Sequence, residues 1–210
     1  MLVTDRQRFA PPRRSEPLAS GEERVISEVL ARGVGAVQLR EKDLDGGPLL
    51  ARARRIREIC DRHGARLLVN GRVDVALACG ADGVHLPGGG LPVDLARKLL
   101  PPGSLVGSSI HHHADLESVQ GADYVIFGPL FETSSKPGYG PAQGTGGLEA
   151  LVAAAGMPVV GIGGITPENA PDVIAAGASG VAMMGAPLTD PGCLEGLVLP
   201  TLSPIFNRPG

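Results

Sequence analysis

Eight short apolar runs recur along the chain, and each is followed by a segment whose apolar residues stand three and four positions apart. This alternation predicts strands at 1–4, 36–40, 66–69, 83–86, 105–108, 124–127, 158–162 and 180–183. The intervening segments predict helices at 21–32, 48–63, 73–79, 91–100, 112–120, 147–155, 167–176 and 191–199. Near-continuous apolar strands are typical of a parallel sheet covered on both faces. We therefore expect a single-domain (β/α)8 TIM barrel over residues 1–210, with an open doubly wound sheet as the alternative.

Two kinds of residue mark the expected helix ends. Thr166-Pro167 is a favourable helix start, because Thr can cap the first amides and Pro needs no donor there. Glycine, which adopts a left-handed conformation easily, follows five of the expected helices, at Gly33, Gly64, Gly80, Gly121 and Gly177.

Composition excludes several classes of function. The net charge is −3, and no basic cluster interleaved with aromatic residues is present, which argues against a nucleic-acid surface. No apolar run reaches the roughly 20 residues of a membrane span, and no secretory signal is visible, so we expect a cytoplasmic protein. The three cysteines lack the spacing of a zinc site.

Glycines at the ends of the last two expected strands suggest a phosphate site. In TIM barrels, the loops after strands seven and eight commonly bind phosphate through backbone amides. Gly163 and Gly164 in GIGGIT and Met184 and Gly185 in AMMGAP are the candidates. Tight turns alone would also account for either stretch, but their pairing at adjacent strand ends favours phosphate.

The second strand ends in QLREK, where Gln38, Arg40 and Lys42 alternate with Leu39 and Glu41. Period-two geometry turns the three polar side chains to one face, toward the barrel mouth. An amide, a guanidinium and an ammonium that converge can hold phosphate or pyrophosphate oxygens.

A long segment, 128–146, follows the sixth expected strand and predicts a lid or binding loop on the catalytic face. It carries Lys136, one of only three lysines in the chain, beside the hydroxyls of Thr133, Ser134 and Ser135. These groups could close over an anionic ligand.

Several motifs, in order, resemble the thiamine phosphate synthase and thiazole tautomerase superfamily: QLREK, Asn70, DGVHL, GSSIH, FGPLFETSSK, GIGGI and AMMGA. The resemblance extends from residue 2 to about residue 191. It implies a small phosphorylated thiazole as ligand and a possible homodimer, while the charge and the lengths of the apolar runs predict no nucleic-acid or membrane partner.

In the synthase branch, a pyrimidine pyrophosphate loses pyrophosphate, and a thiazole phosphate captures the resulting carbocation. The resemblance implies distinct roles for the matching residues: Gln38, Arg40, Lys42, Asn70 and Lys136 for pyrophosphate, Ser109 and Thr133 lining the site, Ser135 for the thiazole, and Gly164, Met184 and Gly185 for its phosphate. That branch uses Mg²⁺ held by two carboxylates, at positions that are Gly71 and Gly90 here. Neither Asp74 nor Asp82 is an evident replacement.

The tautomerase branch resembles this chain in its HLPG and FETSSK segments and needs no metal carboxylates. Tautomerisation requires a positioned acid or base. The histidine of that branch corresponds to Pro129 here, so His111, after the fifth strand, is the candidate catalytic residue. We therefore expect a tautomerase-like isomerase with no cofactor. The alternatives are a thiamine phosphate synthase, for which Mg²⁺ would be expected, and a non-catalytic phosphate-binding relative.

Overall fold

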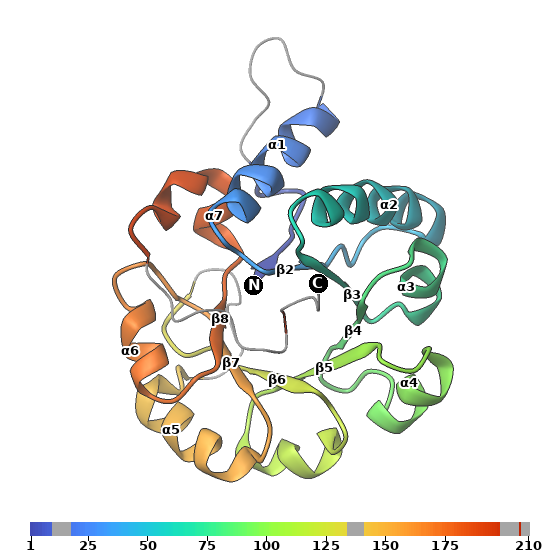
Figure 1. Cartoon of the computed structure of the whole chain (residues 1–210). Helices are drawn as coiled ribbons and strands as arrows, with labels where there is room; N and C mark the ends of the chain where they lie inside the picture. Colours follow the sequence, from blue (N-terminus) through green and yellow to red (C-terminus); the bar gives the residue numbers. More distant parts are fainter. Residues whose placement is uncertain (10–17, 134–140, 198–205, 207–210) are drawn as a thin grey trace.

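The computed structural model describes residues 1–9, 18–133, 141–197 and 206. Eight parallel strands form one sheet in which each strand pairs with the next along the chain (Figure 1). The strands are β1 Leu2–Val3, β2 Ala36–Leu39, β3 Arg66–Asn70, β4 Gly83–Leu86, β5 Leu105–Ile110, β6 Tyr124–Phe127, β7 Val159–Ile162 and β8 Gly180–Ala182. Each overlaps a strand expected from the sequence.

The sheet closes on itself where β1 meets the end of β8. The Val3 amide donates to the Met183 carbonyl at 2.9 Å, and the Met183 amide donates to the Met1 carbonyl at 3.0 Å. A consecutive strand order with this closure confirms the TIM-barrel prediction, since a doubly wound sheet would reverse its order and stay open.

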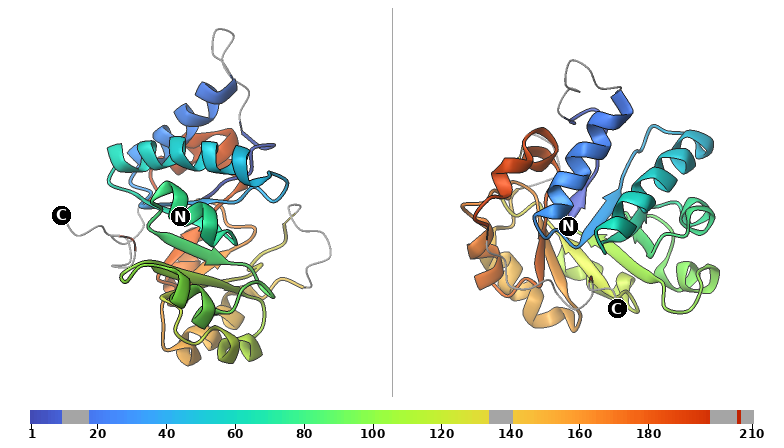
Figure 2. Two further views of the ribbon diagram at one scale, coloured as in Figure 1. Left: turned by 90° about the vertical axis from the view of Figure 1, so that its right-hand side faces the viewer. Right: turned by 45° about the horizontal axis from the view of Figure 1, so that its top comes forward.

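Helices surround the barrel, as both views in Figure 2 show. They are α1 Leu18–Ala31, α2 Gly46–Arg62, α3 Val73–Cys79, α4 Val93–Leu99, η1 His113–Val119, α5 Gly144–Ala155, α6 Ala170–Ala175, α7 Gly185–Thr189 and η2 Pro191–Leu194. The five glycines expected after helices all have positive φ, from 64° to 90°. Among the described residues, no helix is long and apolar enough to cross a membrane.

Three helix predictions need correction. The segment after β5 is a 3₁₀ helix, η1, instead of an α-helix. Helix α6 begins at Ala170 instead of Pro167, because the Asn169 side chain accepts from the Thr166 amide at 2.8 Å and closes a separate turn first. The helix expected at 191–199 is replaced by α7 and η2, and 198–199 lie outside the described residues.

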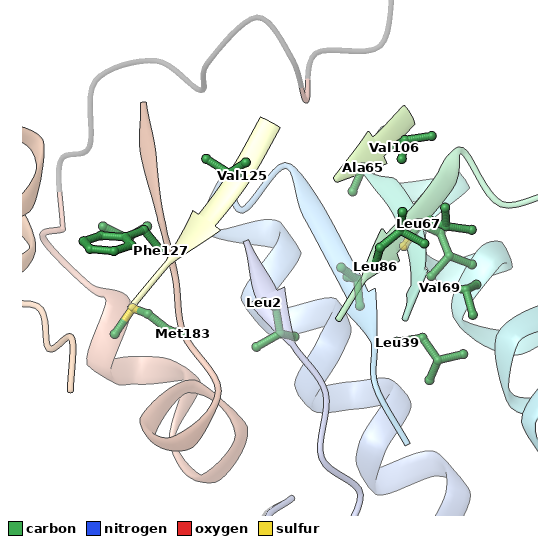
Figure 3. Close-up of a cluster of buried hydrophobic side chains, with 14 of the residues drawn as sticks. Leu2, Leu39, Ala65, Leu67, Val69, Leu86, Val106, Val125, Phe127 and Met183 are labelled. Atoms are coloured by element: carbon green, nitrogen blue, oxygen red, sulfur yellow. The ribbon is translucent and has the colours of Figure 1, made fainter. Parts of the chain in front are cut away.

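The apolar core has two parts. The larger part lies between the sheet and the helices, and Figure 3 shows members from several strands, including Leu39, Leu67 and Phe127. The smaller part fills the barrel interior, and its members are Val3, Ala36, Leu68, Tyr124, Ile126, Val160, Ala182 and Phe206.

Tyr124 is the largest side chain of the barrel interior and contacts the ring of Phe206 edge-on, with centroids 5.2 Å apart. Gly107 on the neighbouring β5 makes room for Tyr124, because any Cβ there would overlap the Tyr124 ring. The interior below the mouth is therefore packed, and the cavities lie above it.

Candidate functional site

Several cavities open at the carboxyl ends of the strands. One of about 770 Å³ is lined by the segment 87–93 after β4 together with Ser109, His111 and Asp115. Two others adjoin each other. The first, here called the central cavity, measures about 130 Å³, and its lining includes Gln38, Arg40, Lys42, Asn70, Ser109 and His111. The second, the side cavity, measures about 330 Å³, and its lining includes Thr133, Gly163, Gly164 and Gly185. Ile162 and Met184 line both cavities and form the wall between them. Every described residue predicted for the site therefore lies in one cavity or in this wall.

The end of β2 supplies the polar side of the central cavity. Gln38 is only 3% exposed, and its buried amide nitrogen has no hydrogen-bond partner within the described part of the chain. Arg40 is half-buried and Lys42 is exposed, so the three side chains lie at successive depths. A buried amide donor without a partner is costly, and a ligand oxygen would satisfy it.

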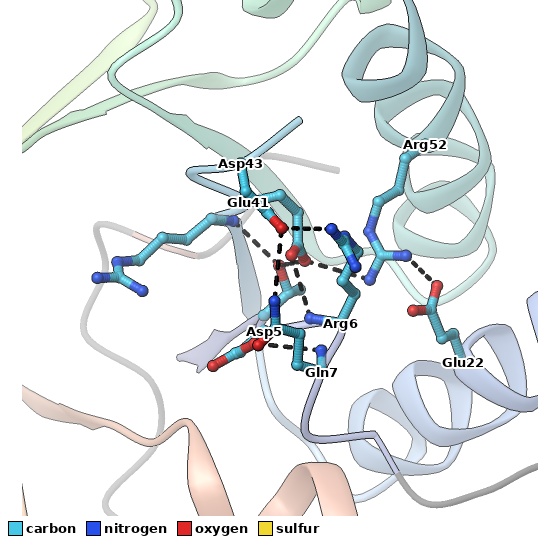
Figure 4. Close-up of polar contacts among 9 residues, drawn as sticks. Asp5, Arg6, Gln7, Glu22, Glu41, Asp43 and Arg52 are labelled. Atoms are coloured by element: carbon cyan, nitrogen blue, oxygen red, sulfur yellow. Dashed lines mark hydrogen bonds and ion pairs between the residues drawn. The ribbon is translucent and has the colours of Figure 1, made fainter. Parts of the chain in front are cut away.

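Glu41 is not part of the lining of this cavity, and it fastens the end of β2 to its neighbours (Figure 4). Its carboxylate accepts from the Thr4 hydroxyl at 2.8 Å and from the Arg6 amide at 3.1 Å. Thr4 in turn accepts from the Arg40 amide at 3.0 Å. This network fixes the backbone from which Arg40 and Lys42 extend.

The same carboxylate connects the strand ends to two helices. Arg52 of α2 lies 3.2 Å from Glu41 through Nη2 and also pairs with Glu22 of α1. Burial raises the pKa of Glu22, while the charge of Arg52 and its hydrogen bond act in the opposite direction. The alternation of polar and apolar residues in QLREK predicted Gln38 and Arg40 as ligands. It did not indicate that Glu41 and Arg52 hold the end of the strand in place.

His85 of β4 occupies the floor of the central cavity. Its Nε2 lies 2.7 Å from the Ser109 hydroxyl, and its Nδ1 lies 3.2 Å from the Tyr124 hydroxyl. Burial raises the pKa of Tyr124, so this side chain remains a neutral phenol. His85 therefore orients the Ser109 hydroxyl at the cavity surface.

His111 lines the central cavity just after β5. Its Nδ1 lies 2.7 Å from the Gly128 carbonyl oxygen, which can only accept, so Nδ1 carries a proton. The amides of His111 and His112 both donate to Asp115, at 2.9 Å each. These backbone hydrogen bonds, with His111 the larger contributor, lower the pKa of Asp115.

The side cavity is built closely around its glycines. A Cβ on Gly163 would lie 2.6 Å from Pro129, and one on Gly164 would lie 2.6 Å from the Glu132 carbonyl oxygen. Both glycines also have positive φ, of 97° and 64°. Gly185, by contrast, has no atom within 4 Å of its Cβ position, so no neighbouring group crowds that side of its backbone.

The aspartates near the expected metal positions are engaged elsewhere. Arg72 binds Asp74 through two hydrogen bonds, of 2.8 and 2.6 Å. Asp82 precedes β4 and pairs with Arg57 and Arg66, so it lies at the opposite end of the strand from the mouth. Of the remaining predicted site residues, Ser135 and Lys136 fall outside the described residues.

The fold and the two cavities define a TIM barrel with a cationic and a glycine-rich pocket at the carboxyl ends of its strands. Residues 1–186 match the family described as thiamine monophosphate synthase, and the chain belongs to this family.

Relatives support this membership. A putative thiamine-phosphate synthase of Geobacter sulfurreducens is 48% identical over 169 residues, covering 80% of this chain and 79% of the relative. The thiamine-phosphate synthase of Methanoculleus marisnigri is 49% identical over 158 residues, or 74% and 75% of the two chains. The structure of thiamine phosphate pyrophosphorylase from Pyrococcus furiosus aligns with TM-score 0.78 and 29% identity, covering 93% and 90%.

These comparisons correct the functional prediction. The sequence motifs placed the chain nearer the tautomerase branch, as an isomerase, but the two relatives are named as synthases, and the similar solved structure is named as a thiamine phosphate pyrophosphorylase. The preference depended on Gly71, Gly90 and the HLPG and FETSSK segments. Relatives with close to half of their aligned residues identical outweigh these local departures.

Proposed function

We propose that this chain is a thiamine-phosphate synthase, a transferase that joins a pyrimidine pyrophosphate to a thiazole phosphate. The observation that carries the proposal is the pair of cavities, one with side-chain cations and one with glycines in its lining, which share Ile162 and Met184 as lining residues within the described part of the chain. A reaction between two anionic substrates needs two such sites side by side.

The proposed reaction requires little from the protein except placement and charge. The C–O bond between the pyrimidine methylene carbon and pyrophosphate breaks, and its electron pair leaves with pyrophosphate. The thiazole ring nitrogen then donates its lone pair to the carbocation, which forms the new C–N bond. Holding both partners in line converts a bimolecular step into an effectively unimolecular one.

Each cavity has a proposed role. Gln38, Arg40, Lys42 and Asn70 bind the pyrophosphate end, with Ser109 beside them. Gly163, Gly164, Met184 and Gly185 hold the thiazole phosphate, and Thr133 lines the same cavity. Ser135 and Lys136 keep their proposed contacts to the thiazole and the pyrophosphate.

His111 is proposed as a binding residue at the cavity wall. The synthase reaction transfers no proton, so the proton-transfer role expected of His111 falls with the tautomerase interpretation. The homodimer stays a prediction.

The Mg²⁺ associated with the synthase branch does not fit the two positions that would hold it. Magnesium prefers carboxylate, phosphate and water oxygens in octahedral geometry. Gly71 and Gly90 offer no side-chain oxygen, and Asp74 and Asp82 are bound by arginines. No step of the proposed reaction is therefore assigned to a metal held there.

The direct test is product formation. Purified protein is incubated with the pyrimidine pyrophosphate and thiazole phosphate, in Mg²⁺ buffer and in EDTA, and thiamine phosphate is measured by chromatography. Formation above the protein-free rate in either buffer is expected. Substrate binding without product in both buffers would instead identify a non-catalytic phosphate-binding relative.

A further inference from the structure

The central cavity is unusual for a pyrophosphate site because its described lining contains no carboxylate. Its polar side chains are those of Gln38, Arg40, Lys42, Asn70, Ser109 and the two histidines His85 and His111. These groups supply amide, guanidinium, ammonium, hydroxyl and imidazole donors. Such a lining offers charge and hydrogen bonds to an anion, and it offers a hard divalent cation no anionic ligand.

Pro87 lies against both positions at which metal-binding carboxylates would be expected. A Cβ on Gly71 would lie 3.5 Å from Pro87 Cδ, and a Cβ on Gly90 would lie 3.1 Å from the same atom. The Gly90 position is also 2.9 Å from the Pro87 carbonyl oxygen, closer than Cβ atoms normally approach. An apolar ring therefore stands against both positions, and the Gly90 site resists any side chain.

Nearby carboxylates do not compensate. Glu41 is committed to Thr4, Arg6 and Arg52 on the far side of the strand end. Asp115 and Glu132 line neighbouring cavities instead of the central cavity, and Asp115 already accepts from the amides of His111 and His112. Within the described residues, no group of three or more histidine, cysteine, aspartate or glutamate side chains could hold a metal ion. The sequence of 134–140, SSKPGYG, contains no acidic residue either.

The geometry points to direct binding of the pyrophosphate group by Arg40, Lys42 and the buried Gln38 amide, which has no partner among the described residues, in place of binding through a carboxylate-held divalent cation. This inference rests on the proposed function. Because the contacts are between protein cations and an anion, magnesium that complexes pyrophosphate in solution lowers the charge the site recognises. Mg²⁺ should therefore leave binding unchanged or weaken it.

Isothermal titration with inorganic pyrophosphate tests this directly. We expect binding in EDTA, and an affinity in Mg²⁺ that is no more than about twofold tighter. Lys42→Ala and Arg40→Ala should each weaken metal-free binding by about tenfold or more, because each removes a charge-assisted contact. Lys98→Ala is the control, since Lys98 is exposed on α4 and pairs with Asp94; it should bind as the wild type does.

A second pair of variants tests the missing carboxylate. Gly71→Asp adds a negatively charged side chain, and Gly71→Asn adds a neutral side chain of the same shape. Both Asp and Asn tolerate the φ of 67° at this position. Without metal, the Asp variant should bind pyrophosphate about tenfold more weakly than the Asn variant, through like-charge repulsion.

Three outcomes would overturn the inference: pyrophosphate binding that requires Mg²⁺, no pyrophosphate binding in either buffer, or equal metal-free binding by Gly71→Asp and Gly71→Asn. The synthase assay is read independently of the titration. Product formation together with Mg²⁺-dependent binding would reject direct binding and keep the proposed function. Metal-free binding without any product would reject the proposed function and keep direct binding.

Discussion

The Thr4 hydroxyl donates to Glu41 at 2.8 Å and accepts from the Arg40 amide at 3.0 Å. One fully buried hydroxyl thereby couples the carboxylate behind the strand end to the backbone of a proposed pyrophosphate ligand. The end of β1 thus helps to set the position of the end of β2.

Thr4→Val keeps the side-chain shape but removes both hydrogen bonds. It should lower the free energy of unfolding by about 1–3 kcal/mol, because a buried amide and a buried carboxylate each lose a partner. It should also weaken pyrophosphate binding, since Arg40 loses its backbone anchor. Denaturant unfolding and titration measure the two effects. Thr4→Ser keeps the hydroxyl and serves as the control, so equal affinities for the two variants would contradict the proposed coupling.

Gly107→Ala tests the packing of the barrel interior. The added methyl overlaps the Tyr124 ring, which has no space to move because it is fully buried. We expect a loss of about 1–3 kcal/mol in unfolding free energy, the usual cost of overpacking. Gly180→Ala in β8 is the matched control, because a Cβ at Gly180 would meet no atom within 4 Å. Similar midpoints for the two variants in thermal unfolding would show that the interior is looser than described.

Gly185→Ala separates ligand binding from folding in the side cavity. The protein leaves the Cβ position at Gly185 empty, so the variant should unfold at the wild-type temperature. A bound phosphate that approaches this backbone would meet the methyl group, and the KM for thiazole phosphate should rise about tenfold or more. An unchanged KM would remove Gly185 from the proposed phosphate site.

Asp115 should contribute a pH-dependent part of the stability. Its pKa is lowered in the folded protein by the amides of His111 and His112. The stabilisation is therefore complete above the ordinary carboxyl pKa of about 3.9 and is lost as the pH falls through the lower folded value. The unfolding free energy of wild type minus that of Asp115→Asn should shrink below about pH 4. Glu117→Gln, an exposed change on the same η1, is the control; a difference that stays constant with pH would contradict the assignment.

The barrel could be predicted because its signal, a mainly apolar run followed by a segment with helical spacing, is repeated eight times. Side-chain hydrogen bonds that change where a helix begins, or which type of helix forms, were harder to predict. Asn169 diverts the Thr166 turn from the helix it would otherwise begin, and the segment after β5 forms a 3₁₀ helix whose entry is fixed by Asp115. Both outcomes depend on single side-chain hydrogen bonds that periodicity does not register.

The candidate site was predictable where side chains follow the strand alternation, as Gln38, Arg40 and Lys42 do. The residues that support them were missed, because Glu41 and Thr4 look like ordinary polar residues until their burial is known. The branch of the family was misjudged for a related reason. Gly71 and Gly90 indicated that the two magnesium-binding carboxylates are absent. The absence of these ligands does not identify the overall reaction.

The wall between the two cavities consists of Ile162 and Met184, both of which are only half-buried. A methionine side chain has three rotatable bonds and adapts its shape to its surroundings. A ligand that moves Met184 in one cavity therefore reshapes the other, and thermodynamic linkage makes the effect equal in both directions. The order in which two substrates enter, and the affinity that each finds, would then depend on the rotamer of a single flexible thioether.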